Sequence, residues 1–489
     1  MHLTQGQPNV FEAYSWSALT PKVLKQSLSA LAAAMLISLP QAPAAFALPA
    51  PMAVSQTVAA TSSAAADSDA EKPAGGRGYI NLTGFPFPLG PFTERRTVQT
   101  ELVPGKVYGF EQEQSLSGIT ANVRSVVFRM EDNHLLVYNP VAPTQEFLAM
   151  LDGLKHDGVS HVLLGATTYE HKIFVGPFAR KFPDAKVWAV PDQWSWPLPL
   201  SAPALGINTK GSGGGELVDS ASGGTAAAAQ AAYARAPDFT SEFEVKLLRP
   251  KQRLGFGYAA NEAALFHKPT GTLCLTDALV NVPARPPTIY DRANLLAVGD
   301  DGRDTGSLGN FILKAAGAVN WRGTAAQEVE ALWVRSDASA SASSNAAAAT
   351  ATEDSDSDAA MAARLQRGWE RNSLLSLYFG PSPSSLVDPD PSFQTLQSKW
   401  IVAPVTDKLI YRSDRVKPEL ARWVEDVGKW DFKMIAPAHF DVRPGTSADF
   451  KAAFAPTLKA ASEPGRPYDR GDVQLLDDLA EALVGIKII

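Results

Sequence analysis

The clearest hydrophobic pattern in the chain lies between residues 161 and 191. The apolar run 162–164 ends in a loop of small residues, 165–168. The next segment, 174–182, carries apolar residues at the three- and four-residue spacing of an amphipathic helix. A second apolar run follows at 186–190. Because strand, helix and strand patterns follow one another, this segment predicts a β-α-β unit.

Two other pairs of apolar runs are separated by short polar segments that are typical of turns. Residues 124–130 and 135–138 flank the first turn, and residues 263–266 and 272–275 flank the second. Both patterns predict β-hairpins. Hairpins beside a β-α-β unit indicate sheets that mix antiparallel and parallel strands.

Three amphipathic segments predict helices that cover these sheets. Thr144 can cap the first helix, Pro418 lies at the start of the second, and Ser447 can cap the third. Each segment has one apolar face, which must be buried against another element. The chain is therefore expected to form an α/β sandwich, with mixed sheets covered by helices.

Biased composition separates the parts of the chain that can pack from those that cannot. We expect a targeting segment at 1–47, a disordered spacer at 48–89, one folded domain at 90–464 and a C-terminal tail with a helix at 465–489. Low-complexity tracts interrupt the domain at about 211–236 and 336–363. Because these tracts carry few large apolar residues, burial cannot offset the entropy of ordering them. We therefore expect surface insertions at both places.

The first 47 residues have the pattern of a targeting signal. Lys22 and Lys25 precede the apolar run 28–39, and residues 45–47 supply a small-x-small cleavage site. The run is too short to cross a bilayer, which requires about 20 residues, so the mature chain is expected to lack an integral membrane span. The long leader before Lys22 indicates an organelle transit peptide followed by an export signal. We therefore expect an organellar protein; an ordinary secretory signal is the alternative.

Composition narrows the class of partner and the chemistry. The chain has 44 basic and 51 acidic residues and a net charge of −7, without a basic stripe, which argues against a nucleic-acid partner. The single cysteine, Cys274, excludes an intramolecular disulfide and a cysteine-based metal cluster. Cys274 lies in an apolar run, which predicts a buried residue rather than a catalytic thiol.

Polar residues that follow apolar strands are the candidates for chemistry. Glu170 and His171 follow one apolar run, and Asp277 and His439 each follow another. Carboxylates and neutral imidazoles bind Zn, Fe or Mn, so these residues predict a metal site if they converge. Each also has a structural alternative: Glu170 can interact with a helix N-terminus, Asp277 can cap a turn, and His439 can bond a backbone carbonyl.

The remaining histidines in the central part of the chain occupy turns and the ends of elements. His134, His156 and His161 are therefore expected to be solvated. His267, in a hairpin turn, is expected at the surface, with a place near the crevice as the alternative. The aromatic segment 194–198 can pack in the core or line a ligand pocket, and packing is the simpler interpretation.

The segment 166–171 resembles the first motif of the metallo-β-lactamase superfamily, His-x-His-x-Asp-His. At the two first histidine positions this chain has Ala166 and Thr168, and Glu170 replaces the aspartate. His171 corresponds to the last histidine and is retained. The resemblance implies an αββα sandwich of mixed sheets with a degenerate metal motif.

Two later residues carry the same resemblance. Asp277 is similar to the family's bridging aspartate, and His439 is similar to its final histidine. The histidine expected before the aspartate-bearing hairpin is not evident in residues 253–258. The resemblance therefore implies that the ligands for one of the family's two metal ions remain and that those for the other are lost.

The chain as a whole resembles a narrower family, a domain of unknown function found in plant, algal and cyanobacterial proteins and related to the metallo-β-lactamase fold. The motifs that carry this resemblance are VAPT at 141–144, EHK at 170–172, FARKFP at 178–183, QWSWP at 193–197, GWER at 368–371 and WDFKMIAPAHF at 430–440. The resemblance implies plastid targeting but no particular reaction. Together with the two-part signal, it leads us to expect a chloroplast protein, in the thylakoid lumen.

Three functions are compatible with these patterns. The first is a catalytically silent relative of the fold that binds a small molecule or assists the assembly of a larger complex. The second is a mononuclear metal-dependent hydrolase that holds one Zn or Fe ion with Glu170, His171, Asp277 and His439. The third is a redox or metal-carrier protein that uses the same residues for Fe. Because three expected histidines are missing, the silent function is favoured.

Overall fold

The computed structural model describes most of the predicted domain. The described residues are 76–80, 89–91, 93–116, 119–193, 201–220, 238–250, 260–300, 353–459, 468 and 471–485, all within the unit Gly75–Ile489. The targeting segment at 1–47, most of the spacer, the greater part of both low-complexity tracts and segments 194–198 and 253–258 lie outside them. The plastid location therefore stays a prediction.

The larger sheet begins as an antiparallel meander and continues as a parallel sheet. Among the described residues its strands are β1 (Thr97–Val103), β2 (Val107–Leu116), β3 (Ile119–Arg129), β4 (Leu135–Tyr138), β5 (Val159–Leu164), β6 (Lys186–Ala189) and β7 (Gly215–Glu216), in this spatial order. Pairing is antiparallel from β1 to β4 and parallel from β4 to β7. The expected hairpin is the β3–β4 pair, in which Asn133 takes the positive φ of 63° that a tight turn demands.

The smaller sheet is also mixed. Its described strands are β8 (Phe243–Leu248), β9 (Glu262–His267), β10 (Thr272–Leu275), β13 (Met434–Pro437) and β14 (Arg443–Pro444), in the spatial order β14-β13-β10-β9-β8. β9 and β10 form the second expected hairpin, and β13 pairs parallel to β10. A separate two-stranded sheet joins β11 (Val280–Asn281) and β12 (Trp400–Ile401).

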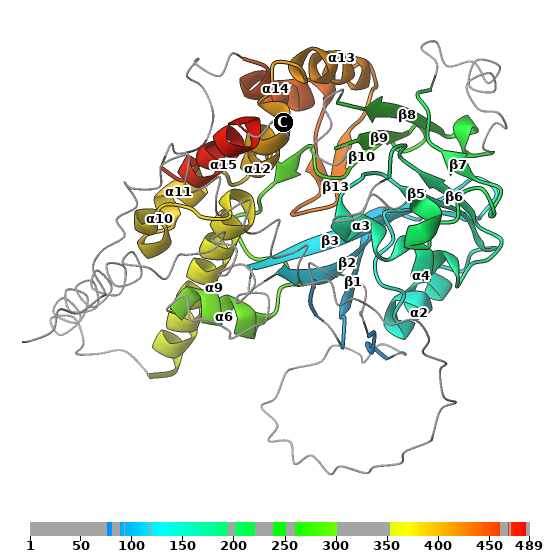
Figure 1. Cartoon of the computed structure of the whole chain (residues 1–489). Coiled ribbons are helices and arrows are strands. Elements are labelled where there is room, and N and C mark those ends of the chain that lie inside the picture. Colours follow the sequence, from blue (N-terminus) through cyan, green and yellow to red (C-terminus); the bar gives the residue numbers. More distant parts are fainter. Residues whose placement is uncertain are drawn as a thin grey trace, which may run out of the picture. The chain divides into compact units, whose positions relative to one another are not determined.

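The helices lie outside the two sheets (Figure 1). They are α2 (Gln145–Gly153), α3 (Tyr169–Lys172), α4 (Val175–Ala179), α6 (Arg292–Asp300), α9 (Glu353–Tyr378), α10 (Pro383–Val387), α11 (Asp390–Gln394), α12 (Pro404–Thr406), α13 (Lys417–Val427), α14 (Ser447–Leu458) and α15 (Gln474–Gly485). Shorter helical turns are η2 (Ala202–Leu205), η3 (Asp238–Ser241) and η5 (Asp407–Tyr411). None of the described helices is both long and apolar enough to cross a bilayer.

One hydrophobic core fills the space between the two sheets. Phe128 and Leu163 of the larger sheet pack in the same cluster as Leu265 and Cys274 of the smaller sheet. Val127, the neighbour of Phe128, belongs to a different cluster because successive residues of a strand point to opposite faces. Cys274 is fully buried, as expected, and burial raises the pKa of its thiol.

Two further cores attach helices to the outer faces of the sheets. Phe147 of α2 and Phe178 of α4 pack on the outer face of the larger sheet. Trp423 of α13 and Phe450 of α14 pack on the outer face of the smaller sheet. Burying such a side chain contributes about 2–3 kcal/mol. The layer order is therefore helix, sheet, sheet and helix, which confirms the expected αββα sandwich of mixed sheets.

The ends of the helices agree closely with the capping residues in the sequence. Thr144 caps α2 by accepting a hydrogen bond from the Phe147 amide. The third helix is capped one residue earlier than expected, because Thr446 rather than Ser447 forms a capping box with Asp449. A helix in the predicted tail segment 465–489 is present as α15.

Both low-complexity tracts contribute some regular structure at their ends. The first tract, from Gly211, includes β7, and the next residue, Leu217, is buried in the core between the sheets. A Cβ on Gly214 would overlap the backbone of Val187, so glycine here permits the close approach of two strands. The second tract ends inside α9, which begins at Glu353.

Two histidines are buried, contrary to the expectation from the sequence. His161 in β5 is 2% exposed, and His267 at the end of β9 is 0% exposed. The turn after β9 does not expose His267, because the ring packs between Phe128 and Phe243, with ring centroids 4.9 Å and 4.6 Å away. Burial, together with the charge of Lys106, lowers the pKa of His267 from 6.5 to about 4.

The buried His267 predicts a loss of stability in mild acid. The unfolded chain takes up a proton near pH 6.5, whereas the folded chain resists protonation down to about pH 4. The free energy of unfolding should therefore decrease as the pH falls from about 6.5 to about 4. Urea unfolding at several pH values should show this slope, and a His267→Gln variant should show a weaker one. An unchanged slope in the variant would contradict the assignment.

Candidate metal centre

Glu170 and His171 reach the site through a tight turn after β5. Gly165 follows the strand directly, and a Cβ there would overlap the hydroxyl of Tyr138. The Gly165 amide donates to Oδ1 of Asn139 at 2.7 Å, which fixes the start of the turn. Thr168 is extended and precedes α3, so Glu170 and His171 lie on the first turn of this short helix.

Asp277 and His439 reach the same place from the smaller sheet. Asp277 comes two residues after β10, and His439 comes two residues after β13. These strands are parallel neighbours, with Leu275 opposite Pro437. Because parallel strands end at the same edge of a sheet, the segments that follow them bring both side chains together.

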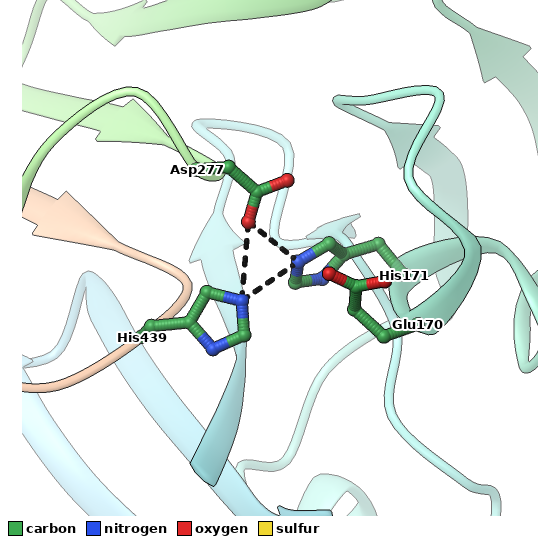
Figure 2. A group of neighbouring side chains, drawn as sticks. All are labelled: Glu170, His171, Asp277 and His439. Atoms are coloured by element: carbon green, nitrogen blue, oxygen red, sulfur yellow. Dashed lines mark hydrogen bonds and ion pairs between the residues drawn. The ribbon is translucent and has the colours of Figure 1, made fainter. Parts of the chain in front are cut away.

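The predicted residues converge on one point (Figure 2). Nε2 of His171 lies 3.1 Å from Nε2 of His439 and 3.2 Å from Oδ1 of Asp277. Nε2 of His439 lies 3.1 Å from the same Oδ1 atom. A carboxylate oxygen of Glu170 completes a group whose ligand atoms are all within 4.8 Å of one another. The side chain of His171 is fully buried, whereas those of Asp277 and His439 are 17% and 16% exposed.

Hydrogen bonds to the site orient the ligand atoms. Nδ1 of His439 lies 2.8 Å from the carbonyl oxygen of Asn122. A carbonyl only accepts, so Nδ1 carries the proton, and in the neutral ring Nε2 keeps its lone pair toward the other three residues. The Thr168 hydroxyl donates to Oδ2 of Asp277 at 2.7 Å, which leaves Oδ1 directed at the histidines.

A buried glutamate holds the turn that carries Asp277. The carboxyl group of Glu262 accepts hydrogen bonds from the amides of Thr276 and Asp277, at 2.6 Å and 3.1 Å. Burial, reinforced by the charge of Asp277, raises the pKa of Glu262 to about 8. Glu262 therefore positions the backbone of the site without itself being one of the converging side chains.

Asn122 fixes the turn around His439. Its side-chain amide donates to the carbonyl of Phe440 at 2.9 Å and to Glu111 at 2.8 Å, and its Oδ1 accepts from the Phe440 amide at 2.7 Å. Arg124 binds Glu111 and the carbonyls of Pro437 and Phe440. The His439 backbone is thus clamped to β3 on both sides.

The electrostatics of the group favour negative charge on Asp277 and protonation of His439. Burial alone would raise the pKa of Asp277, but His171 and His439 hold it well below its usual range. Burial alone would lower the pKa of His439, but its hydrogen bond with Asp277, the Asp277 charge and the Glu170 charge raise it. A cation is therefore favoured at this point, whether it is a proton or a metal ion.

The donor set fits a metal ion of the Zn or Fe type. Imidazole nitrogens and carboxylate oxygens bind these ions at about 2 Å, which places neighbouring ligand atoms about 3 Å apart. The three distances among His171, Asp277 and His439 have this value. In addition, Nδ1 of His439 forms a hydrogen bond with a backbone carbonyl oxygen. Metal-binding histidines are commonly oriented by such a hydrogen bond.

Sequence reasoning missed the residues that support the site. Asn122 and Arg124 alternate with apolar residues in β3, a pattern that usually marks a solvated face. Glu262 left a clearer signal, since it is a charged residue at the start of a strand that is otherwise Ala, Leu, Phe and His. Thr168 stands where the family resemblance has a histidine, and no sequence pattern indicates that its hydroxyl donates to Asp277.

The fold and site together define a two-sheet α/β sandwich with a His-and-carboxylate centre at the edge of its sheets. The chain belongs to the family described as domain of unknown function DUF4336, whose matches cover residues 104–390 and 387–455. This confirms the expected membership in a domain-of-unknown-function family. No curated protein matches the chain in sequence.

Solved structures with similar folds include flavodiiron and metallo-β-lactamase proteins. The Flv1 flavodiiron core from Synechocystis sp. PCC6803 has a TM-score of 0.35 and 7% identity, over 74% of this chain and 61% of that one. The chain thus spans about three fifths of the Flv1 core. A metallo-β-lactamase from Pontibacter korlensis has a TM-score of 0.26 and 12% identity, over 42% of this chain and 83% of that one.

A third structure is the metallo-β-lactamase FIM-1 from Pseudomonas aeruginosa, in its mono-zinc form. It has a TM-score of 0.25 and 9% identity, over 45% of this chain and 94% of that one.

The clamp around His439 predicts a large stability effect at Asn122. An Asn122→Ala change leaves Glu111 and both backbone groups of Phe440 without this partner, which should cost about 3 kcal/mol. Asn294→Ala is the matched control, because Asn294 makes an exposed hydrogen bond to Glu113. Urea unfolding should separate the two variants clearly. Equal and small effects would show that Asn122 does not hold the turn.

Proposed function

We propose that the protein binds one transition-metal ion through His171, His439, Asp277 and Glu170 and that it is a mononuclear metal-dependent hydrolase. The observation that carries this proposal is the convergence of two imidazole nitrogens and one carboxylate oxygen, 3.1–3.2 Å apart. These atoms come from three segments far apart in the sequence, and Asn122 and Thr168 orient two of the three side chains.

Two features support one ion rather than two. Ala166 stands where the metallo-β-lactamase pattern has its first histidine. It is buried, and its side chain has no atom that can bind a metal ion. Thr168 stands at the second histidine position, and its hydroxyl binds Oδ2 of Asp277. The oxygen that would bridge to a second ion is therefore already hydrogen-bonded.

The chemistry supplied by one such ion is activation of water and polarisation of a carbonyl or phosphoryl oxygen. His171, fully buried, would hold its position rigidly. His439 and Asp277 are partly exposed, so a substrate can approach from their side. Without a second ion to stabilise developing charge, hydrolysis should be slower than at a two-metal centre.

A catalytically silent function is the second candidate, and the charge distribution favours it specifically. The raised pKa of His439 beside the lowered pKa of Asp277 allows a protonated histidine to balance the carboxylate without a metal. In that case the group would be a buried ion pair that stabilises the sheet edge, and the protein would bind a small molecule or assist assembly.

Metal analysis separates the two candidates. Tag-free protein loaded with Zn²⁺ and then desalted should retain stoichiometric metal. His171→Ala and His439→Ala should each remove most of it, because each deletes a ligand atom. His134→Ala is the control, since His134 lies in the β3–β4 turn beside Asp132. Assays of phosphodiester and thioester hydrolysis should then show slow turnover that depends on the retained metal.

Each result has a distinct meaning. Metal content that is low in the wild type, or unaffected by both ligand changes, would overturn the metal proposal. Stoichiometric metal without turnover on any substrate would retain the metal site and overturn the hydrolase assignment. Preferential retention of Fe would favour a redox or carrier protein instead.

Thr168 provides a test of how the second oxygen of Asp277 is held. Thr168→Val has the same shape but lacks the donor to Oδ2, so metal affinity should fall about tenfold, as is usual for residues that orient a ligand. Thr168→Ser keeps the hydroxyl and should restore most of the affinity. Competition with a chromophoric chelator measures both. Equal affinities of the Val and Ser variants would exclude this role for the hydroxyl.

A further inference from the structure

The strand that supports His439 has an edge that no other strand covers. β3 pairs with β2 along nearly its whole length, whereas β4 pairs only with residues 126–129. In an antiparallel pair, every second residue directs its backbone N–H and C=O away from the partner strand. In the uncovered part of β3 these residues are Thr120, Asn122 and Arg124, and all three are buried. The Arg124 amide donates to the Ala438 carbonyl at 2.7 Å, and side chains supply the partners at the other two positions.

The side chain of Asn372 replaces a paired strand at Thr120. Its Oδ1 accepts from the Thr120 amide at 3.0 Å, and its Nδ2 donates to the Thr120 carbonyl at 2.7 Å. A neighbouring strand would form the same two bonds. Asn372 lies in α9, directly after the GWER motif at 368–371. The helix that carries this motif therefore holds the free edge of β3.

Tyr290 takes the corresponding place at Asn122. Its hydroxyl accepts from the Asn122 amide at 3.1 Å and donates to Oδ1 of the same residue, 3.3 Å away. The Asn122 carbonyl, on the same edge of β3, accepts from Nδ1 of His439 at 2.8 Å. Asn122 is thus held by Tyr290 at its amide and side chain, and it holds a candidate metal ligand at its carbonyl.

Packing gives the Tyr290 hydroxyl a fixed position. Tyr290 is 4% exposed, and its ring lies edge-on to that of Trp369, with 4.9 Å between the ring centroids. The indole N–H of Trp369 donates to the Pro283 carbonyl at 2.9 Å, which fixes the second ring in turn. Burial raises the pKa of Tyr290. The hydroxyl therefore keeps its proton, as its donation to Oδ1 of Asn122 requires.

We propose that Tyr290 is a positioning residue for metal binding by His439 and acts through Asn122; this inference rests on the metal function proposed above. The Tyr290 hydroxyl fixes Asn122, and the Asn122 carbonyl then fixes the plane of the His439 ring. In that orientation Nε2 of His439 faces Nε2 of His171 and Oδ1 of Asp277. Metal-binding histidines depend on such outer hydrogen-bond partners for their orientation. Tyr290 itself does not bind the ion.

The zinc affinity of a Tyr290→Phe variant of the full chain tests this proposal. The phenyl ring keeps its packing against Trp369, and only the hydroxyl is lost. Competition with a chromophoric chelator should show zinc affinity about tenfold lower, the usual effect of losing an outer partner of a metal ligand. Tyr468→Phe is the matched control, because it removes a buried hydroxyl that binds Asp407 instead. The control should bind zinc as the wild type does.

A spectroscopic measurement separates positioning from a general loss of stability. In the ¹H–¹⁵N NMR spectrum of the zinc-loaded protein, the Nδ1 proton of His439 is assigned by its loss in His439→Gln. Its exchange with solvent should be faster in Tyr290→Phe, because the carbonyl that accepts it is held less firmly. The exchange should be unchanged in Tyr468→Phe. Urea unfolding without metal should show lower midpoints for both tyrosine variants, since each loses a buried hydrogen bond.

The possible failures are distinguishable. A wild type that retains no zinc would overturn the metal function of the site, and this positioning role with it. Zinc that is retained by the wild type and held equally well by Tyr290→Phe would overturn the positioning role alone. Equal losses of zinc affinity in Tyr290→Phe and Tyr468→Phe would also overturn it, because stability and not the orientation of His439 would then be the cause. Unchanged exchange of the Nδ1 proton in Tyr290→Phe would exclude the path through Asn122.

Discussion

The negative charge of Asp277 is the constraint around which the site is arranged. A carboxylate removed from most of its water costs several kcal/mol unless donors or cations compensate it. Thr168 and His171 after β5 and His439 after β13 surround this carboxylate. Glu262 holds its backbone. Parallel pairing of β10 with β13 brings Asp277 and His439 together. Packing of the larger sheet against the smaller one adds Thr168 and His171.

The sequence was sufficient for several of the elements and for the residues that converge. Hydrophobic periodicity located the β3–β4 and β9–β10 hairpins, and capping residues located α2 to within a residue. The convergence of Glu170, His171, Asp277 and His439 was also predictable, because each follows an apolar strand. Strand ends are visible in a sequence, since polar residues interrupt apolar runs there.

The supporting contacts were not predictable from periodicity, because they depend on which elements become neighbours. Asn122 binds Phe440 across 318 positions of sequence, and no local pattern encodes that contact. The expectation that His267 lies at the surface was wrong. The larger sheet covers the residue, and the local sequence does not show that this sheet packs there. Glycines near Gly214 suggested an insertion, whereas in the fold they allow β7 to approach β6.

The central claim is that one metal ion lies among Glu170, His171, Asp277 and His439. Anomalous diffraction from crystals of the metal-loaded protein, recorded on both sides of the metal absorption edge, tests it most directly. A single peak within bonding distance of both Nε2 atoms and of Oδ1 is the predicted result. A peak elsewhere, a second peak on the Thr168 side of Asp277, or no peak at all would contradict it.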